Sequence, residues 1–172
     1  MHQAEVMLAT KTANGFASDS IHWPMLASRK MDGMRLLCWG GQLLTRTLKP
    51  QPNKALAEKL KPLTDKCLKE GIVLDGEIYS HHHAFDVHQS VIRSENQDLP
   101  SQMHYLVFDG MPLEEWGCCP RSFEERQSFL HEVLPSLGES SSCPWGIVDQ
   151  FEVYDSSDAQ QWMDQWIQSG YE

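Results

Sequence analysis

The sequence of 172 residues has no apolar run approaching the ~20 residues that span a bilayer, which argues against a transmembrane protein and a membrane partner. Its first five residues, Met1 to Glu5, lack the basic start and apolar stretch of a secretory signal. It also has no G-x-x-x-x-G-K-[ST] segment, which excludes a P-loop ATPase. The composition, 41% hydrophobic and 22% charged, is typical of a folded soluble protein with room for one domain.

Positive charge is scarce. There are 14 Lys and Arg residues against 24 Asp and Glu residues, and the formal net charge is −10. Nucleic-acid binding depends on basic surface and counterion release, so the overall field opposes it. However, most of the positive charge lies in residues 29–69, and the acidic excess lies largely after Asp75. A local basic strip therefore stays open as a nucleic-acid contact, although this asymmetry identifies no partner.

The five cysteines form no C-x-x-C pair, and their odd count lacks the spacing of a disulfide framework. We interpret them as ordinary thiols of a reducing compartment. His81, His82 and His83, with Asp86 and His88 nearby, could bind zinc. Runs of three histidines in polar loops are more often solvated, so we favour a solvated loop over a metal site.

The pattern of apolar residues predicts alternating strands and helices. A pair of short strands around Gly40-Gly41 is a hairpin signal. The expected strands are a hairpin over 34–45 and single strands at 72–79, 104–109 and 146–154.

Capping residues predict where the helices begin and end. Asn53 caps a helix that Pro62 breaks or restarts and that Gly71 ends. Ser122 and Glu125 form a capping box. A last helix is expected to begin at Ser156 or Ser157 and to end at Gly170, with Trp162 and Trp166 burying one face.

The residues around Lys30 are the most informative for chemistry. A lysine is a nucleophile only when deprotonated, which requires burial or nearby positive charge. A tight turn beside a sheet, with Arg29 and Arg35 close in sequence, could supply both. Taken alone, the segment is equally compatible with a surface lysine in a loop.

Five segments occur in a fixed order and together carry a resemblance: KMDGMR (30–35), TRTLKP (45–50), LDGEI (74–78), YLVFDG (105–110) and GYE (170–172). In this order they resemble motifs I, Ia, III, IIIa and IV of the covalent nucleotidyltransferase superfamily, which includes ATP-dependent DNA ligases, RNA ligases and mRNA capping enzymes. The resemblance implies an α+β fold, with antiparallel sheets and flanking helices around a nucleotide cleft. It implies one partial adenylation domain over residues 1–172.

The resemblance also implies roles for individual residues. Lys30 would attack the α-phosphorus of ATP as the catalytic nucleophile. Phe108 would stack on the base, and Glu77 would bind the ribose hydroxyls or a metal. Mg²⁺ is the implied ion, with Glu77 and Glu172 as its carboxylate ligands. The implied nucleotide-binding residues are Arg29, Asp32, Arg35, Arg46, Glu77 and Phe108.

Within the superfamily, segments 7–11, 46–53 and 85–91 resemble small phage- or virus-like DNA ligases. This branch implies a monomeric enzyme that uses ATP and Mg²⁺ and seals nicked double-stranded DNA in replication, repair and recombination. It implies the cytoplasm of a bacterium or of a bacterial host cell. An RNA ligase and a non-catalytic nucleotide-binding remnant remain as alternatives.

The family pattern continues beyond residue 172 with the rest of motif IV, a Lys-x-Lys motif V and an OB-fold domain. We therefore expect a chain truncated at its C-terminus, with most DNA contacts in the missing region. Without the motif V cations, we expect self-adenylation to be slow or absent, since the charge that develops at phosphorus lacks its closest partners.

Overall fold

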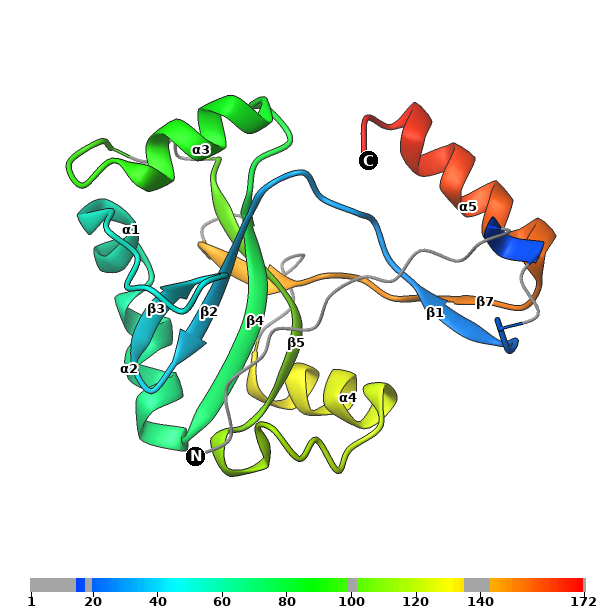
Figure 1. Cartoon of the computed structure of the whole chain (residues 1–172), viewed down its shortest axis with the longest axis horizontal. Helices are drawn as coiled ribbons and strands as arrows, with labels where there is room; N and C mark the ends of the chain where they lie inside the picture. Colours follow the sequence, from blue (N-terminus) through cyan, green and yellow to red (C-terminus); the bar gives the residue numbers. More distant parts are fainter. Residues whose placement is uncertain (1–14, 18–19, 99–101, 135–142, 172) are drawn as a thin grey trace. The chain divides into compact units, whose positions relative to one another are not determined.

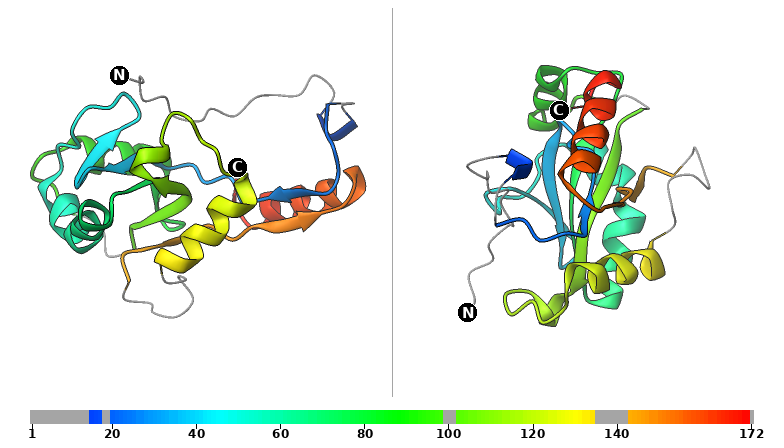
Figure 2. Two further views of the ribbon diagram at one scale, coloured as in Figure 1. Left: turned by 90° about the horizontal axis from the view of Figure 1, so that it is seen from below. Right: turned by 90° about the vertical axis from the view of Figure 1, so that its right-hand side faces the viewer.

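The computed structural model describes residues 15–17, 20–98, 102–134 and 143–171 (Figures 1 and 2). These residues separate into two compact units. The larger unit lies within Gly33–Ile147, and the smaller unit combines the described residues before Gly33 with those after Ile147. Within the described residues, every helix falls short of the length and apolar content that a bilayer crossing requires.

The larger unit is built on a five-stranded sheet with the order β3-β2-β4-β5-β6. Its strands are β2 (Met34–Trp39), β3 (Gln42–Thr45), β4 (Ile72–Tyr79), β5 (His104–Pro112) and β6 (Trp145–Ile147). The expected antiparallel pairing is confirmed for β2 with β3, β2 with β4 and β4 with β5. It is wrong for β6, which runs parallel to β5, because the chain returns through helix α4 (Phe123–Val133), the kind of crossover that parallel strands require.

The hairpin between β2 and β3 forms where the sequence predicts it. Gly40 and Gly41 have φ angles of 56° and 80°, in the left-handed region that is open to glycine at little cost. Two consecutive positive φ angles match the twist of the flanking strands, which explains why these residues make the turn.

Helices α1 (Lys54–Lys59), α2 (Lys61–Glu70) and α3 (Phe85–Arg93) pack with one face of the sheet, and α4 packs with β5 (Figure 1). Leu36 and Leu74 of the strands share a buried cluster with Leu56 and Leu63 of the helices. Because side chains alternate along a strand, residues such as Arg35 and Glu77 lie on the opposite face. The apolar face thus fixes the sheet and leaves the other face for polar residues.

Asn53 connects two helices of this layer, and its predicted cap is confirmed. Its Oδ1 accepts a hydrogen bond from the Leu56 N–H at 2.8 Å, at the start of α1. Its Nδ2 lies 2.9 Å from the carbonyl oxygens of Val91 and Ser94 at the end of α3. Since Asn53 is fully buried, no water replaces these partners.

The breaks around α2 also follow the sequence. Pro62 lies in the first turn of α2, where its missing N–H leaves no intrahelical bond unmade. Gly71 ends the helix in the left-handed conformation at φ 64°. The predicted capping box of Ser122 and Glu125 is confirmed at the start of α4.

The smaller unit differs from the sequence prediction in its strands. The single strand expected over 146–154 is divided into β6 and β7 (Phe151–Val153), and β7 pairs with β1 (Met25–Ala27) in a two-stranded antiparallel sheet. Asp149 lies between them and bonds a side chain, Arg29, instead of continuing a strand. Helix α5 (Ser156–Gln168) begins at Ser156, as predicted, and its cap is Asp155, whose carboxylate accepts from two N–H groups at 2.8 and 2.9 Å.

The expected burial of one tryptophan face of α5 is confirmed. Trp162 and Trp166 lie one helical turn apart, and their ring centroids are 4.4 and 5.8 Å from that of Phe151 on β7. These offset aromatic contacts hold α5 against the small sheet. The tryptophans therefore have a packing role within the smaller unit.

Substitution of Asn53 by alanine should destabilise the larger unit by about 3 kcal/mol, because the cap and the buried partners of α3 are lost together. Ser122→Ala provides a matched control, since Ser122 is an exposed cap whose loss costs about 1 kcal/mol. Urea unfolding followed by far-ultraviolet circular dichroism measures both. Equal losses would show that the contacts from Asn53 to α3 contribute nothing.

Candidate functional site

A row of charged side chains lies on the sheet face opposite the helices. Arg35 on β2 is the strand partner of Glu77 on β4. Two residues further along β2, Leu37 is the strand partner of Asp75. Residues of one strand at this spacing share a face, so Arg35, Asp75 and Glu77 project from the same side of the sheet. The two strands thereby bring together two residues of motif-like segments that are 42 positions apart in the printed sequence.

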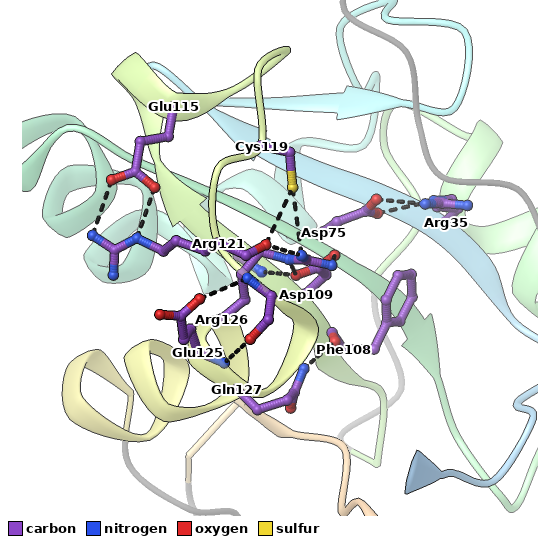
Figure 3. A network of polar contacts seen from close by, with 12 residues as sticks. Arg35, Asp75, Phe108, Asp109, Glu115, Cys119, Arg121, Glu125, Arg126 and Gln127 are labelled. Carbon is purple, nitrogen blue, oxygen red and sulfur yellow. Dashed lines mark hydrogen bonds and ion pairs between the residues drawn. The ribbon is translucent and has the colours of Figure 1, made fainter. Parts of the chain in front are cut away.

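Arg35 binds Asp75 through two parallel hydrogen bonds. Arg35 Nε donates to Asp75 Oδ1 at 2.9 Å, and Nη2 donates to Oδ2 at 2.5 Å (Figure 3). The exposed fraction of the side chain is 2% for Asp75 and 17% for Arg35. Burial raises the pKa of the Asp75 carboxyl above its ordinary value, and the hydrogen bonds from Arg35 oppose only part of that rise.

Two glycines allow the strands to approach at this site. A Cβ on Gly76 would lie 2.5 Å from the Leu106 carbonyl oxygen, and a Cβ on Gly33 would lie 2.4 Å from the Ile78 carbonyl oxygen. Because both obstacles are backbone atoms, no side-chain rotation relieves them. The Gly33 N–H also donates to Glu77 Oε1 at 3.0 Å, which ties the start of β2 to this carboxylate.

Phe108 lies at an irregularity in β5. The pairs Asp75 with Asp109 and Gly76 with Val107 leave Phe108 as an extra residue between them, which is a β-bulge. The Arg35 guanidinium carbon lies 5.2 Å from the centroid of the half-buried Phe108 ring. Bulges redirect side chains, so the aromatic ring lies beside the charged row and not in the helix-facing core.

Arg46 lies on the exposed turn that follows β3. The turn is closed by two backbone hydrogen bonds of 2.8 Å, from Thr45 N–H to the Lys49 carbonyl and from Leu48 N–H to the Thr45 carbonyl. Arg46 is thus carried on a defined turn of the larger unit, with its side chain open to solvent.

In the smaller unit, Arg29 connects two parts of the chain. Its Nη2 donates to Asp149 Oδ2 at 2.5 Å, and its guanidinium carbon lies 5.3 Å from the ring centroid of Tyr171. Tyr171 belongs to the motif IV-like segment, so the residue before Lys30 contacts that segment directly. Lys30 and Asp32 are exposed, so the burial expected for a nucleophilic lysine is not met in this structure. Glu172 lies outside the described residues.

The histidine-rich segment contains a fully buried histidine, His88. No group of three or more His, Cys, Asp or Glu residues suited to a metal occurs in the part of the chain that the structure describes. His88 is buried and accepts a hydrogen bond through Nε2 from the Ser80 N–H at 3.1 Å, which is a structural contact. The five cysteines are all free thiols.

The motif resemblance assigns no role to four polar residues around this site: Asp75, Asp109, Arg126 and Gln127. Asp75 and Asp109 interrupt apolar strands, and a buried carboxylate requires a partner, which is a usable signal. Arg126 supplies that partner to Asp109 at 2.7 and 3.0 Å. No local pattern on α4 distinguishes Arg126 or Gln127 from exposed helix residues, so only the tertiary structure identifies them.

Comparison with known proteins identifies the family of this chain. Residues 6–172 match the family model of the ATP dependent DNA ligase domain. The chain therefore belongs to the ATP-dependent DNA ligase domain family, and its fold is that of the adenylation domain of these enzymes. No curated protein sequence matches the chain.

Three solved structures illustrate the shared fold. The Chlorella virus DNA ligase-adenylate has a TM-score of 0.70 and 20% identity, with 96% of this chain and 56% of that chain covered. A Lig E DNA ligase has a TM-score of 0.67 and 21% identity over 98% and 59% of the two chains. The bacteriophage T7 ATP-dependent DNA ligase in complex with ATP has a TM-score of 0.60 and 23% identity over 81% and 52%. The chain spans between half and three fifths of the length of these ligases.

Replacement of Arg35 by methionine should destabilise the larger unit by about 3 kcal/mol at neutral pH, because an ionised Asp75 would remain buried without its partner. The loss should shrink as the pH falls. A carboxyl whose folded pKa is raised contributes stability that is present at low pH and is lost as the pH rises through that pKa. Removal of Arg35 raises the pKa further and enlarges this effect.

Urea unfolding at about pH 7 and about pH 5 measures the change, with the double variant Arg35→Met/Asp75→Asn as the matched control. The double variant should recover most of the stability and lose the added pH dependence. A loss for Arg35→Met that is equal at both pH values contradicts this account.

Proposed function

We propose that the chain is the adenylation domain of an ATP-dependent DNA ligase, in which Lys30 becomes covalently bound to AMP. The observation that carries this proposal is the placement of Arg35, Glu77 and Phe108 on neighbouring strands of one sheet face, in a chain of the DNA ligase domain family. These are three of the residues for which the motifs imply nucleotide contacts.

The side chains available on this face suit a nucleotide. Phe108 offers an aromatic surface for stacking on the base. Glu77 offers carboxylate oxygens that accept hydrogen bonds from ribose hydroxyls. Arg35 and the exposed Arg46 offer guanidinium groups for phosphate, and Arg29 and Asp32 flank Lys30 in sequence. Lys30 precedes Gly33 by three residues, so chain length alone keeps its Cα within about 11 Å of the Gly33 Cα, whatever the arrangement of the two units.

The reaction proposed for Lys30 balances without a further reactant. The neutral Nζ attacks the α-phosphorus of ATP, a nitrogen–phosphorus bond forms, and the bond to the bridging oxygen breaks to release pyrophosphate. The amine loses a proton to solvent. In the whole enzyme the AMP group then passes to a 5′-phosphate, and a 3′-hydroxyl displaces AMP to seal the strand. Phosphoryl transfer of this kind depends mainly on positioning and on neutralisation of negative charge.

Mg²⁺ fits the donors present on the sheet face. Mg²⁺ prefers oxygen ligands and is usually held by one or two carboxylates together with substrate phosphates. Glu77 is the described residue that would contribute a carboxylate here, and Glu172 is the second proposed ligand. When bound, the ion would neutralise charge on the phosphates.

The proposed substrate is nicked double-stranded DNA, and the proposed setting is replication, repair or recombination. The similarity to the Chlorella virus and bacteriophage T7 ligases supports a phage- or virus-like enzyme. We place it as a monomer in the cytoplasm of a bacterium or its infected host, where ATP and DNA are both present and where the free thiols remain reduced.

Incubation of the 172-residue protein with α-labelled ATP and Mg²⁺ should slowly give a labelled protein that survives denaturation in detergent. The label should be released by acid and kept in alkali, as expected of a bond between a lysine nitrogen and phosphorus. In Lys30→Ala the label should fall to background, because the proposed nucleophile is removed. Gel autoradiography over several hours measures this, including a slow reaction.

Lys69→Ala is the matched control, since Lys69 is an exposed lysine in the last turn of α2 and should keep full labelling. Persistent label in Lys30→Ala would overturn the assignment of the nucleophile. If the wild type binds ATP but forms no adduct, the chain is a nucleotide-binding protein without lysine transfer. Absence of both binding and adduct refutes the whole proposal.

A further inference from the structure

We propose that Gln127, supported by Arg126, is a positioning residue that fixes the Phe108 ring for base stacking. This inference rests on the proposed function, because it assigns Phe108 to the base. Its starting point is the β-bulge, since Phe108 lies between the pairs that join β4 and β5 and is outside their regular register. The ladder alone therefore does not fix the orientation of this residue.

Two consecutive residues of α4 hold two consecutive residues of the bulge. Gln127 Nε2 donates to the Phe108 carbonyl oxygen at 2.8 Å. Arg126 donates to the Asp109 carboxylate from Nε at 2.7 Å and from Nη2 at 3.0 Å (Figure 3). A displacement of either side chain would change the backbone at Phe108 and so the direction of its ring.

The burial of these side chains is not explained by stability. Gln127 has an exposed fraction of 6%, and its Oε1 is buried without a hydrogen-bond partner in the described structure. An unsatisfied buried oxygen is unfavourable, and an apolar side chain of the same size would avoid it. The feature that an apolar residue cannot supply is the N–H that reaches the Phe108 carbonyl.

Arg126 also contacts residues outside the bulge. Its Nη1 donates to the Arg121 carbonyl oxygen at 3.0 Å and lies 3.4 Å from Cys119 Sγ. Arg126 therefore also orders the loop before α4, and its replacement would disturb more than the bulge. Gln127, whose described hydrogen bond is the one to Phe108, is the better residue for a test.

Gln127→Met keeps the length of the side chain and removes the donor. We expect little net change in thermal stability, because the unpaired Oε1 is removed while the Phe108 carbonyl loses its donor, and about 3- to 10-fold weaker binding of α,β-methylene-ATP. Isothermal titration calorimetry measures this affinity without turnover, since the analogue cannot release pyrophosphate. Ser128→Ala, an exposed change on the same helix, should leave both quantities unchanged.

A double variant separates positioning from general damage. Phe108→Ala should weaken binding about 10-fold or more, through loss of stacking. If Gln127 acts through the ring, Phe108→Ala/Gln127→Met should bind no more weakly than Phe108→Ala alone. Additive losses, or unaltered affinity in Gln127→Met, would overturn the positioning role. An unaltered affinity in Phe108→Ala would instead refute the proposed base contact itself.

Discussion

The buried pairing of Arg35 with Asp75 is the interaction on which the charged sheet face depends. Asp75 lies in the middle of a strand whose residues are mostly buried, where an ionised carboxylate alone would be strongly unfavourable. The two hydrogen bonds from Arg35 compensate for this and at the same time hold the guanidinium beside the Phe108 ring. One ion pair therefore sets the position of a cation and the environment of an aromatic side chain.

A second buried pair repeats this solution on the neighbouring strand. Asp109 is the strand partner of Asp75, so two carboxylates lie across from each other, and the charge of Asp109 adds to the burial that raises the pKa of the Asp75 carboxyl. Each has its own arginine, Arg35 from β2 and Arg126 from α4. Buried ion pairs of this kind give little net stability. We infer that their role is to fix the geometry of the bulge next to them.

Much of the fold follows from local sequence signals. Gly40 and Gly41 define a hairpin and Asn53 a helix start, because turns and caps depend on a few adjacent residues. The parallel pairing of β6 and the division of 146–154 into two strands depend on distant partners, and no local pattern contains them. The same limit applies to the site. Motif-like segments indicate Arg35, Glu77 and Phe108, whereas Gln127 depends on the packing of α4 against β5.

The smaller unit combines chain segments that come before and after the larger unit in the sequence. This arrangement has a consequence for biosynthesis. Met25 on β1 pairs with Val153 on β7. The first strand therefore cannot pair until residues up to Val153 have left the ribosome. The described residues of the larger unit all lie between Gly33 and Ile147, so they leave the ribosome before β7 does. A nascent polypeptide interrupted before β7 would thus present Lys30 without the strand pairing that precedes it, and this segment would stay accessible to chaperones and proteases until β7 has been synthesised.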